Sequence, residues 1–119
     1  MVEDYKIIRR ETVYSGRAFA VEKVFLHLPD QRTSQYDLVQ HSGAVTILPL
    51  DSNGTVWFVE QYRIGAQAHL LELPAGVLKP GEDPGECALR ELREETGKSA
   101  RSLVKLGEFF MAPGYTTEK

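Results

Sequence analysis

Residues 76–97 read GVLKPGEDPGECALRELREETG. A helix is predicted here from Pro84 to Thr96. Asp83 is a suitable N-cap, because its side chain can accept a hydrogen bond from a free backbone N–H, and Pro84 suits the first helical position. Gly97 suits the position just after the helix, where the backbone often turns left-handed. These signals define both ends of the predicted helix.

Three carboxylates gather on this helix. Glu91, Glu94 and Glu95 are neighbours because residues three and four apart lie on one side. Their repulsion and the negative end of the helix dipole destabilise the helix unless positive charge lies nearby. A hard divalent cation would supply that charge through oxygen ligands. An acidic helix face can also be simply solvated, with Arg90 pairing with Glu86 or Glu94, so the helix alone leaves both interpretations open.

The spacing across the whole stretch is more specific. From Gly76 it follows G-x5-E-x7-R-E-L-x-E-E-x-G, which resembles the signature of the Nudix hydrolase family. The next position usually holds a bulky aliphatic residue, and Lys98 stands there, where we expect it to affect local packing rather than the metal site. The resemblance covers roughly residues 37–118. Segments similar to the ADP-ribose pyrophosphatase branch are GAV (43–45), EQYR (60–63), LELPAG (71–76) and PGY (113–115).

The resemblance implies a metal site for Mg²⁺, with Mn²⁺ as a substitute. Glu91 and Glu95 would be the principal ligands, and Glu94 would bind a further ion or orient water. The backbone carbonyl of Ala75 would be an extra ligand. Arg90 would hold the glutamates in place without touching substrate. Glu94, Glu95 and Arg90 are therefore the expected catalytic residues, whereas the general base stays unassigned.

The resemblance also implies substrate-binding residues. Arg63 would reach the diphosphate or the nearby sugar, because a guanidinium suits phosphate oxygens, although it could be a surface arginine. Glu72 would contact the substrate or a metal-bound water, and Glu118 the terminal ribose. Val77 is also expected to bind the substrate. Glu82 is either a structural support or an outer ligand.

The implied function is metal-dependent hydrolysis of the diphosphate in a nucleoside diphosphate-linked small molecule. ADP-ribose, cleaved to AMP and ribose 5-phosphate, is the expected substrate, and GDP-mannose or another nucleotide sugar is the alternative. A non-catalytic nucleotide-sensing Nudix-like module is an alternative of another class. Such modules usually lose the helix glutamates, which are all present here.

The expected fold is α/β (α+β): a Nudix-type α/β/α sandwich with a mixed sheet. Residues 1–42 would form an antiparallel N-terminal sheet that contributes to dimerisation and substrate binding, and residues 43–119 the Nudix core. Because about twenty residues follow Gly97, the core is expected to be incomplete at its C-terminus. Strands are predicted at 6–14, 19–27, 35–40 and 103–110, and one buried hairpin at 44–62, turning at 51–54.

Composition limits the other possibilities. The chain has 119 residues, 42% of them hydrophobic, and a net charge of -3, which argues against a nucleic-acid partner. No apolar run approaches the roughly 20 residues needed to span a membrane, and no signal peptide is visible. The single cysteine, Cys87, indicates a reducing, cytoplasmic compartment. The family resemblance implies a homodimer. We expect Trp57 in the core, and His27, His41 and His69 in structural or surface positions.

Overall fold

The computed structural model describes residues 4–119. The chain forms two compact units, one of Met1–Gly43 with Glu108–Lys119 and the other of Ala44–Gly107. The first unit therefore includes residues 108–119, which the predicted division between residues 42 and 43 assigns to the Nudix core. The functional roles expected for the two parts stay predictions.

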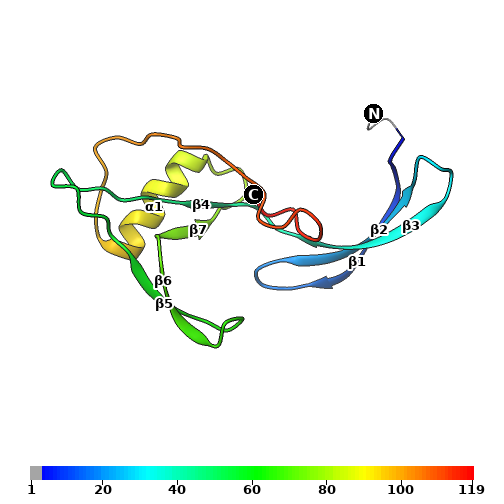
Figure 1. Cartoon of the computed structure of the whole chain (residues 1–119), viewed down its shortest axis with the longest axis horizontal. Coiled ribbons are helices and arrows are strands. Elements are labelled where there is room, and N and C mark those ends of the chain that lie inside the picture. Colours follow the sequence, from blue (N-terminus) through cyan, green and yellow to red (C-terminus); the bar gives the residue numbers. More distant parts are fainter. Residues whose placement is uncertain (1–3) are drawn as a thin grey trace. The chain divides into compact units, whose positions relative to one another are not determined.

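The first unit is built on an antiparallel sheet in the order β1-β2-β3 (Figure 1). Residues 115–117 attach to its β3 edge: the Val39 amide donates to the Tyr115 carbonyl at 2.7 Å, and the Thr117 amide donates to the Val39 carbonyl at 3.0 Å. The predicted N-terminal sheet is therefore confirmed. Its strands are β1 (Lys6–Ser15), β2 (Ala20–His27) and β3 (Thr33–Gln40).

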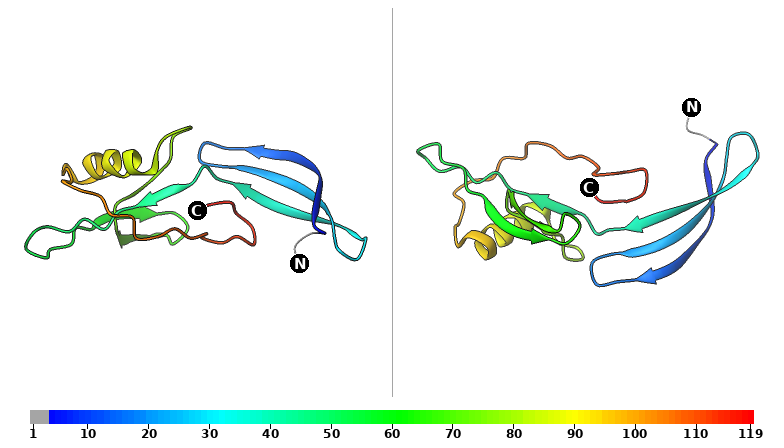
Figure 2. Two further views of the ribbon diagram at one scale, coloured as in Figure 1. Left: turned by 90° about the horizontal axis from the view of Figure 1, so that it is seen from above. Right: turned by 60° about the horizontal axis from the view of Figure 1, so that its bottom comes forward.

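The second unit combines two short antiparallel pairs with the helix. β4 pairs with β7, β5 pairs with β6, and α1 contacts both β7 and β4 (Figure 2). This places one face of the helix against the β4–β7 pair. The elements are β4 (Ala44–Thr46), β5 (Val59–Arg63), β6 (Ala68–Glu72), β7 (Ala75–Val77) and α1 (Pro84–Thr96).

The helix has the predicted bounds and caps. Asp83 Oδ2 accepts a hydrogen bond from the Glu86 amide at 3.1 Å. Gly97 has φ 73°, and its amide donates to the Arg93 carbonyl at 2.9 Å. Glycine suits this left-handed end because it has no Cβ. Cys87 and Leu92 are buried, so these two side chains anchor the helix.

The predicted hairpin over residues 44–62 is wrong. β4 pairs with β7 and β5 with β6. The expected pairing is limited to the residues around the turn, where Leu50 and Val56 form a bridge, the Asp51 amide donates to the Thr55 carbonyl at 2.9 Å and the Trp57 amide donates to the Pro49 carbonyl at 3.2 Å. Pro49 lacks the N–H that a continuous ladder requires. Burial also alternates, with Ile47 buried and Leu48 48% exposed, so the apolar run is not covered on both faces.

Two further expectations are corrected. Residues 103–110 contain no strand, and each of them is exposed. Trp57 is 39% exposed rather than in the core. Its indole N–H donates to Asp51 Oδ2 at 2.6 Å, and Lys98 Nζ lies 3.9 Å from the ring centroid. Lys98 therefore contributes a local cation–π contact beside the helix end.

The mixed α+β class is confirmed by these elements. Among residues 4–119, no helix has the length and apolarity that crossing a bilayer requires.

Candidate metal and phosphate site

A side chain of the helix lies directly against β7 at Gly76. A Cβ added to Gly76 would overlap the end of the Glu91 side chain. The side chain of Glu91 is only 13% exposed, so it has little room to move aside. Glycine at this position therefore allows the Glu91 carboxylate to lie against the strand.

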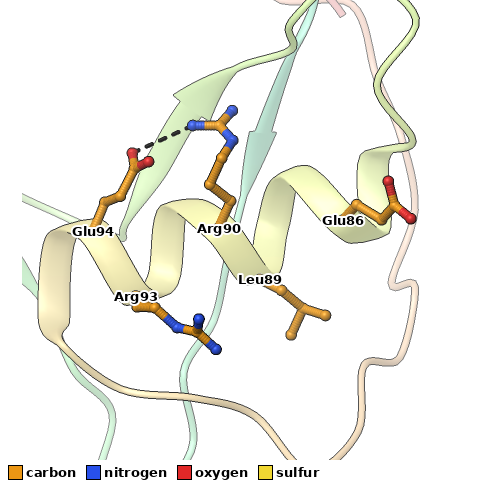
Figure 3. A pocket seen from close by; sticks show the side chains of 5 residues that line it. All are labelled: Glu86, Leu89, Arg90, Arg93 and Glu94. Atoms are coloured by element: carbon orange, nitrogen blue, oxygen red, sulfur yellow. Dashed lines mark hydrogen bonds and ion pairs between the residues drawn. The ribbon is translucent and has the colours of Figure 1, made fainter.

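The guanidinium of Arg90 forms hydrogen bonds with three carboxylates. Arg90 donates to Glu82 from Nε and from Nη2, both at 2.9 Å. Its Nη1 donates to Glu91 at 2.8 Å and to Glu94 at 3.3 Å. Figure 3 shows Arg90 and Glu94 on one side of α1 and Arg93 directed to another. Arg90 thus supplies positive charge where the glutamates would otherwise repel one another, and the hydrogen bond to Glu82 is the main reason that its pKa is raised.

Glu95 points toward two strands instead of toward Arg90. Its Oε2 accepts from the Ala75 amide at 3.3 Å, and its Oε1 accepts from Gln61 Nε2 at 3.5 Å. The backbone at Ala75, predicted to provide a carbonyl ligand, is therefore next to Glu95. Gln61 received no role from the sequence; the available signal was its position two residues before Arg63, on the same strand face.

Arg63 and Glu72 form a bidentate pair. Arg63 Nε lies 2.9 and 3.1 Å from the two carboxylate oxygens, and Nη2 lies 2.6 Å from Oε1. This hydrogen bonding lowers the pKa of Glu72 and raises the pKa of Arg63, with a smaller contribution to Arg63 from the charge of Glu95. The structure thus joins two of the predicted substrate-binding residues to each other.

The other two predicted substrate-binding residues are placed differently. Val77 is 45% exposed, and its carbonyl accepts from Arg90 Nη2 at 3.4 Å. Glu118 belongs to the other unit, where its Oε1 lies 4.0 Å from His41 Nε2. It lines a cavity of about 440 Å³ there, together with Phe19, Val39, His41, Met111, Ala112, Tyr115 and Thr116.

The donor set suits a hard divalent cation. Glu91, Glu94 and Glu95 all provide carboxylate oxygens, the ligand type that Mg²⁺ and Mn²⁺ prefer. Within residues 4–119 of the present conformation, no three His, Cys, Asp or Glu side chains already converge as a ligand set. The three glutamates instead bond to Arg90, Gln61 and the Ala75 amide. The chemistry fits, and an ion would replace some of these hydrogen bonds.

Cys87 is unsuited to nucleophilic catalysis. It is buried, and desolvation, followed by a hydrogen bond to Glu82, raises its pKa to about 11. The thiol is therefore protonated near neutral pH, whereas the thiolate is the nucleophilic form. A second cavity, of about 360 Å³, is lined entirely by α1 residues: Glu86, Leu89, Arg90, Arg93 and Glu94 (Figure 3).

The low pKa of Glu82 makes the free energy of unfolding depend on pH in the acid range. The hydrogen bond from Arg90 is the largest cause that lowers the pKa of Glu82 from 4.5 to about 2. Because the folded-state pKa is depressed, the stabilisation is full above about 4.5 and is lost as the pH falls toward 2. We expect Glu82→Gln to flatten this part of the profile of unfolding free energy against pH, measured by denaturant titration. Glu86→Gln, an exposed position on the same helix, is the control, and identical slopes for Glu82→Gln and the wild type would contradict the assignment.

Comparison with known proteins places this arrangement in a family. Residues 40–118 match the NUDIX domain. The chain is 37% identical over 113 residues to an ADP-ribose pyrophosphatase of Bacillus subtilis, covering 95% of this chain and 61% of that one. It is 32% identical over 120 residues to a GDP-mannose pyrophosphatase of Yersinia enterocolitica, covering 92% and 62%.

A solved structure shares the fold. The crystal structure of an ADP compounds hydrolase superposes with a TM-score of 0.83 at 30% identity, over 99% of this chain and 64% of that one. The chain therefore spans about three fifths of the length of these relatives. The match over residues 40–118 includes the whole helix motif and both strand pairs of the second unit. The chain belongs to the NUDIX domain family.

Proposed function

We propose that the protein to which this chain belongs hydrolyses the diphosphate of a nucleoside diphosphate-linked substrate in a reaction that requires a divalent metal ion. The observation that carries the proposal is the contact of Glu91 with Gly76, fastened by Arg90. It brings an oxygen ligand of the helix motif to the strand that precedes it. A solvated acidic face would not require a glycine at the point of contact.

The proposed roles are those that the resemblance to the family implies, and the hydrogen bonds of Arg90 support them. Glu91, Glu94, Glu95 and the Ala75 carbonyl hold Mg²⁺, for which Mn²⁺ can substitute. The bound ion supplies positive charge that polarises the diphosphate and lowers the pKa of a water. Glu94 binds a further ion or orients the water, and Arg90 positions Glu91 and Glu94 through its hydrogen bonds. Arg63 binds a phosphate oxygen, and Val77 contacts the rest of the substrate. The contact of Glu118 with the terminal ribose stays a prediction from the sequence.

ADP-ribose is the proposed substrate, with AMP and ribose 5-phosphate as products. The name of the Bacillus subtilis relative supports this choice. GDP-mannose is the second candidate, supported by the name of the Yersinia enterocolitica relative. The presence of Glu91, Glu94 and Glu95 disfavours a non-catalytic sensing module. That alternative also predicts a different outcome in the assay below.

The proposed setting is a cytoplasmic homodimer. β1 exposes Ile7, Ile8, Val13 and Tyr14, each at least 48% accessible, which supports contact between N-terminal sheets. The net charge of -3 disfavours a nucleic-acid partner, and no membrane partner is proposed.

A side-by-side assay tests the proposal. We expect the chain to release AMP from ADP-ribose with Mg²⁺ and to release none after chelation, with products separated by chromatography. Faster release of GMP from GDP-mannose would retain the reaction and change the substrate. Metal-dependent thermal stabilisation by ADP-ribose without product would instead support a sensing module.

A further inference from the structure

Three polar side chains share one face of the β5–β6 hairpin, and one of them contacts the helix. In its register, Gln61 is opposite Leu70 and Arg63 is opposite Ala68. Because alternate residues of a strand share a face, Gln61, Arg63 and Glu72 lie on the same side, here called the polar hairpin face. Gln61 donates to Glu95 from this face. The polar hairpin face is thus adjacent to a proposed metal ligand.

The Arg63 side chain runs back along this face to reach Glu72. Glu72 is opposite Val59, four residues from Arg63 on its own strand. The three contacts of 2.6–3.1 Å all use the Nε–Nη2 edge of the guanidinium. A guanidinium has five N–H donors in a fixed plane, so this bidentate contact leaves donors for a second anion and fixes their direction.

The exposed fractions of the two side chains suit such a second contact. Arg63 is 47% exposed and Glu72 is 25% exposed, so an anion can reach the guanidinium more readily than the carboxylate. A bare carboxylate would also repel a diphosphate, whereas one paired with Arg63 is largely neutralised. These observations favour a contact of the substrate with Arg63 and disfavour one with Glu72.

We propose that Glu72 is a positioning residue that holds the guanidinium of Arg63 ready for a phosphate oxygen and does not itself contact the substrate. This inference rests on the proposed function. An arginine without a partner must lose rotamer freedom when the ligand binds, whereas Arg63 has already lost it in the folded chain. The pair therefore increases affinity by preorganisation.

A double-mutant cycle separates positioning from direct contact. Inorganic pyrophosphate is titrated calorimetrically into the full chain with Mg²⁺ present, for the wild type, Glu72→Gln, Arg63→Ala and the double variant. We expect Glu72→Gln to raise the Kd on the order of tenfold, as the loss of an outer-shell partner does. In the Arg63→Ala background the same change should have no further effect.

Each other outcome overturns part of the argument. An equal loss from Glu72→Gln in both backgrounds would mean that Glu72 acts without Arg63, and tighter binding by Glu72→Gln would mean that its charge only opposes the ligand. Both results would overturn the inference but leave the proposed function standing. No binding of pyrophosphate by the wild type would contradict the proposed function, and the inference would fail with it.

Two controls exclude a general structural effect. Glu60 lies 3.7 Å from His69 on the opposite face of the same hairpin, so Glu60→Gln should leave the Kd unchanged. The Arg63 Nε–H resonance in a proton–nitrogen NMR spectrum should exchange slowly with solvent in the wild type and rapidly in Glu72→Gln. A slow exchange that persists in Glu72→Gln would show that Glu72 does not hold the guanidinium.

Discussion

Glu95→Gln is expected to reduce turnover of ADP-ribose by about 100-fold or more, since even outer-shell partners of a metal contribute roughly 10- to 100-fold. The substitution removes the negative charge that a divalent ion requires. It retains an oxygen that can accept from the Ala75 amide, which lies 3.3 Å from the present carboxylate. The fold should therefore persist, and the loss should be confined to metal binding and catalysis.

The measurement is kcat with Mg²⁺, together with broadening of NMR signals near the helix on titration with Mn²⁺, which reports binding independently of turnover. Glu86→Gln is the matched control, because Glu86 is an exposed glutamate of the same helix. An undiminished rate and unchanged broadening in Glu95→Gln would remove Glu95 from the metal site.

Gly76→Ala is expected to weaken Mg²⁺ binding by about tenfold or more and to lower activity with it. The new methyl group would occupy the position of the Glu91 side chain, which would have to leave β7 and its hydrogen bond with Arg90. Overpacking of this kind destabilises a fold by about 1–3 kcal/mol. The chain should therefore remain folded at low temperature while its metal affinity falls.

Calorimetric titration with Mg²⁺ and thermal unfolding of the same samples distinguish the two effects. Gly65→Ala is the matched control, because a Cβ there would meet nothing within 4 Å. Equal Mg²⁺ affinities for Gly76→Ala and Gly65→Ala would contradict the view that Gly76 determines the position of Glu91.

The sequence was sufficient for the features that depend on local signals. Asp83, Pro84 and Gly97 defined the helix because capping acts within a few residues. Three strands of the first unit followed from residue type and turns. By contrast, the choice of strand partners is non-local: β4 pairs with β7 across a distant segment, and nothing within residues 44–62 indicates this.

The same distinction applies to the candidate site. The motif identified Glu91, Glu94 and Glu95, and the structure places them on the confirmed helix. It did not reveal that Arg63 bonds with Glu72, because that contact depends on the register of β5 and β6 and on the length of an arginine side chain. Gln61 was overlooked for a related reason, since an amide near a carboxylate has no spacing signature of its own.

The first unit is built from two stretches of the chain that are far apart in the sequence. This affects the order in which its contacts can form during synthesis. β1, β2 and β3 can pair as soon as they leave the ribosome, but His41 must wait for Thr117, which follows 76 residues later. The entropy of closing so long a loop grows slowly, by about 0.6 kcal/mol for each doubling of length. The long separation therefore delays this contact in time but adds little to the free-energy cost of forming it. During that interval residues 44–107 can fold, while the backbone of Val39 presents an open strand edge to other nascent chains.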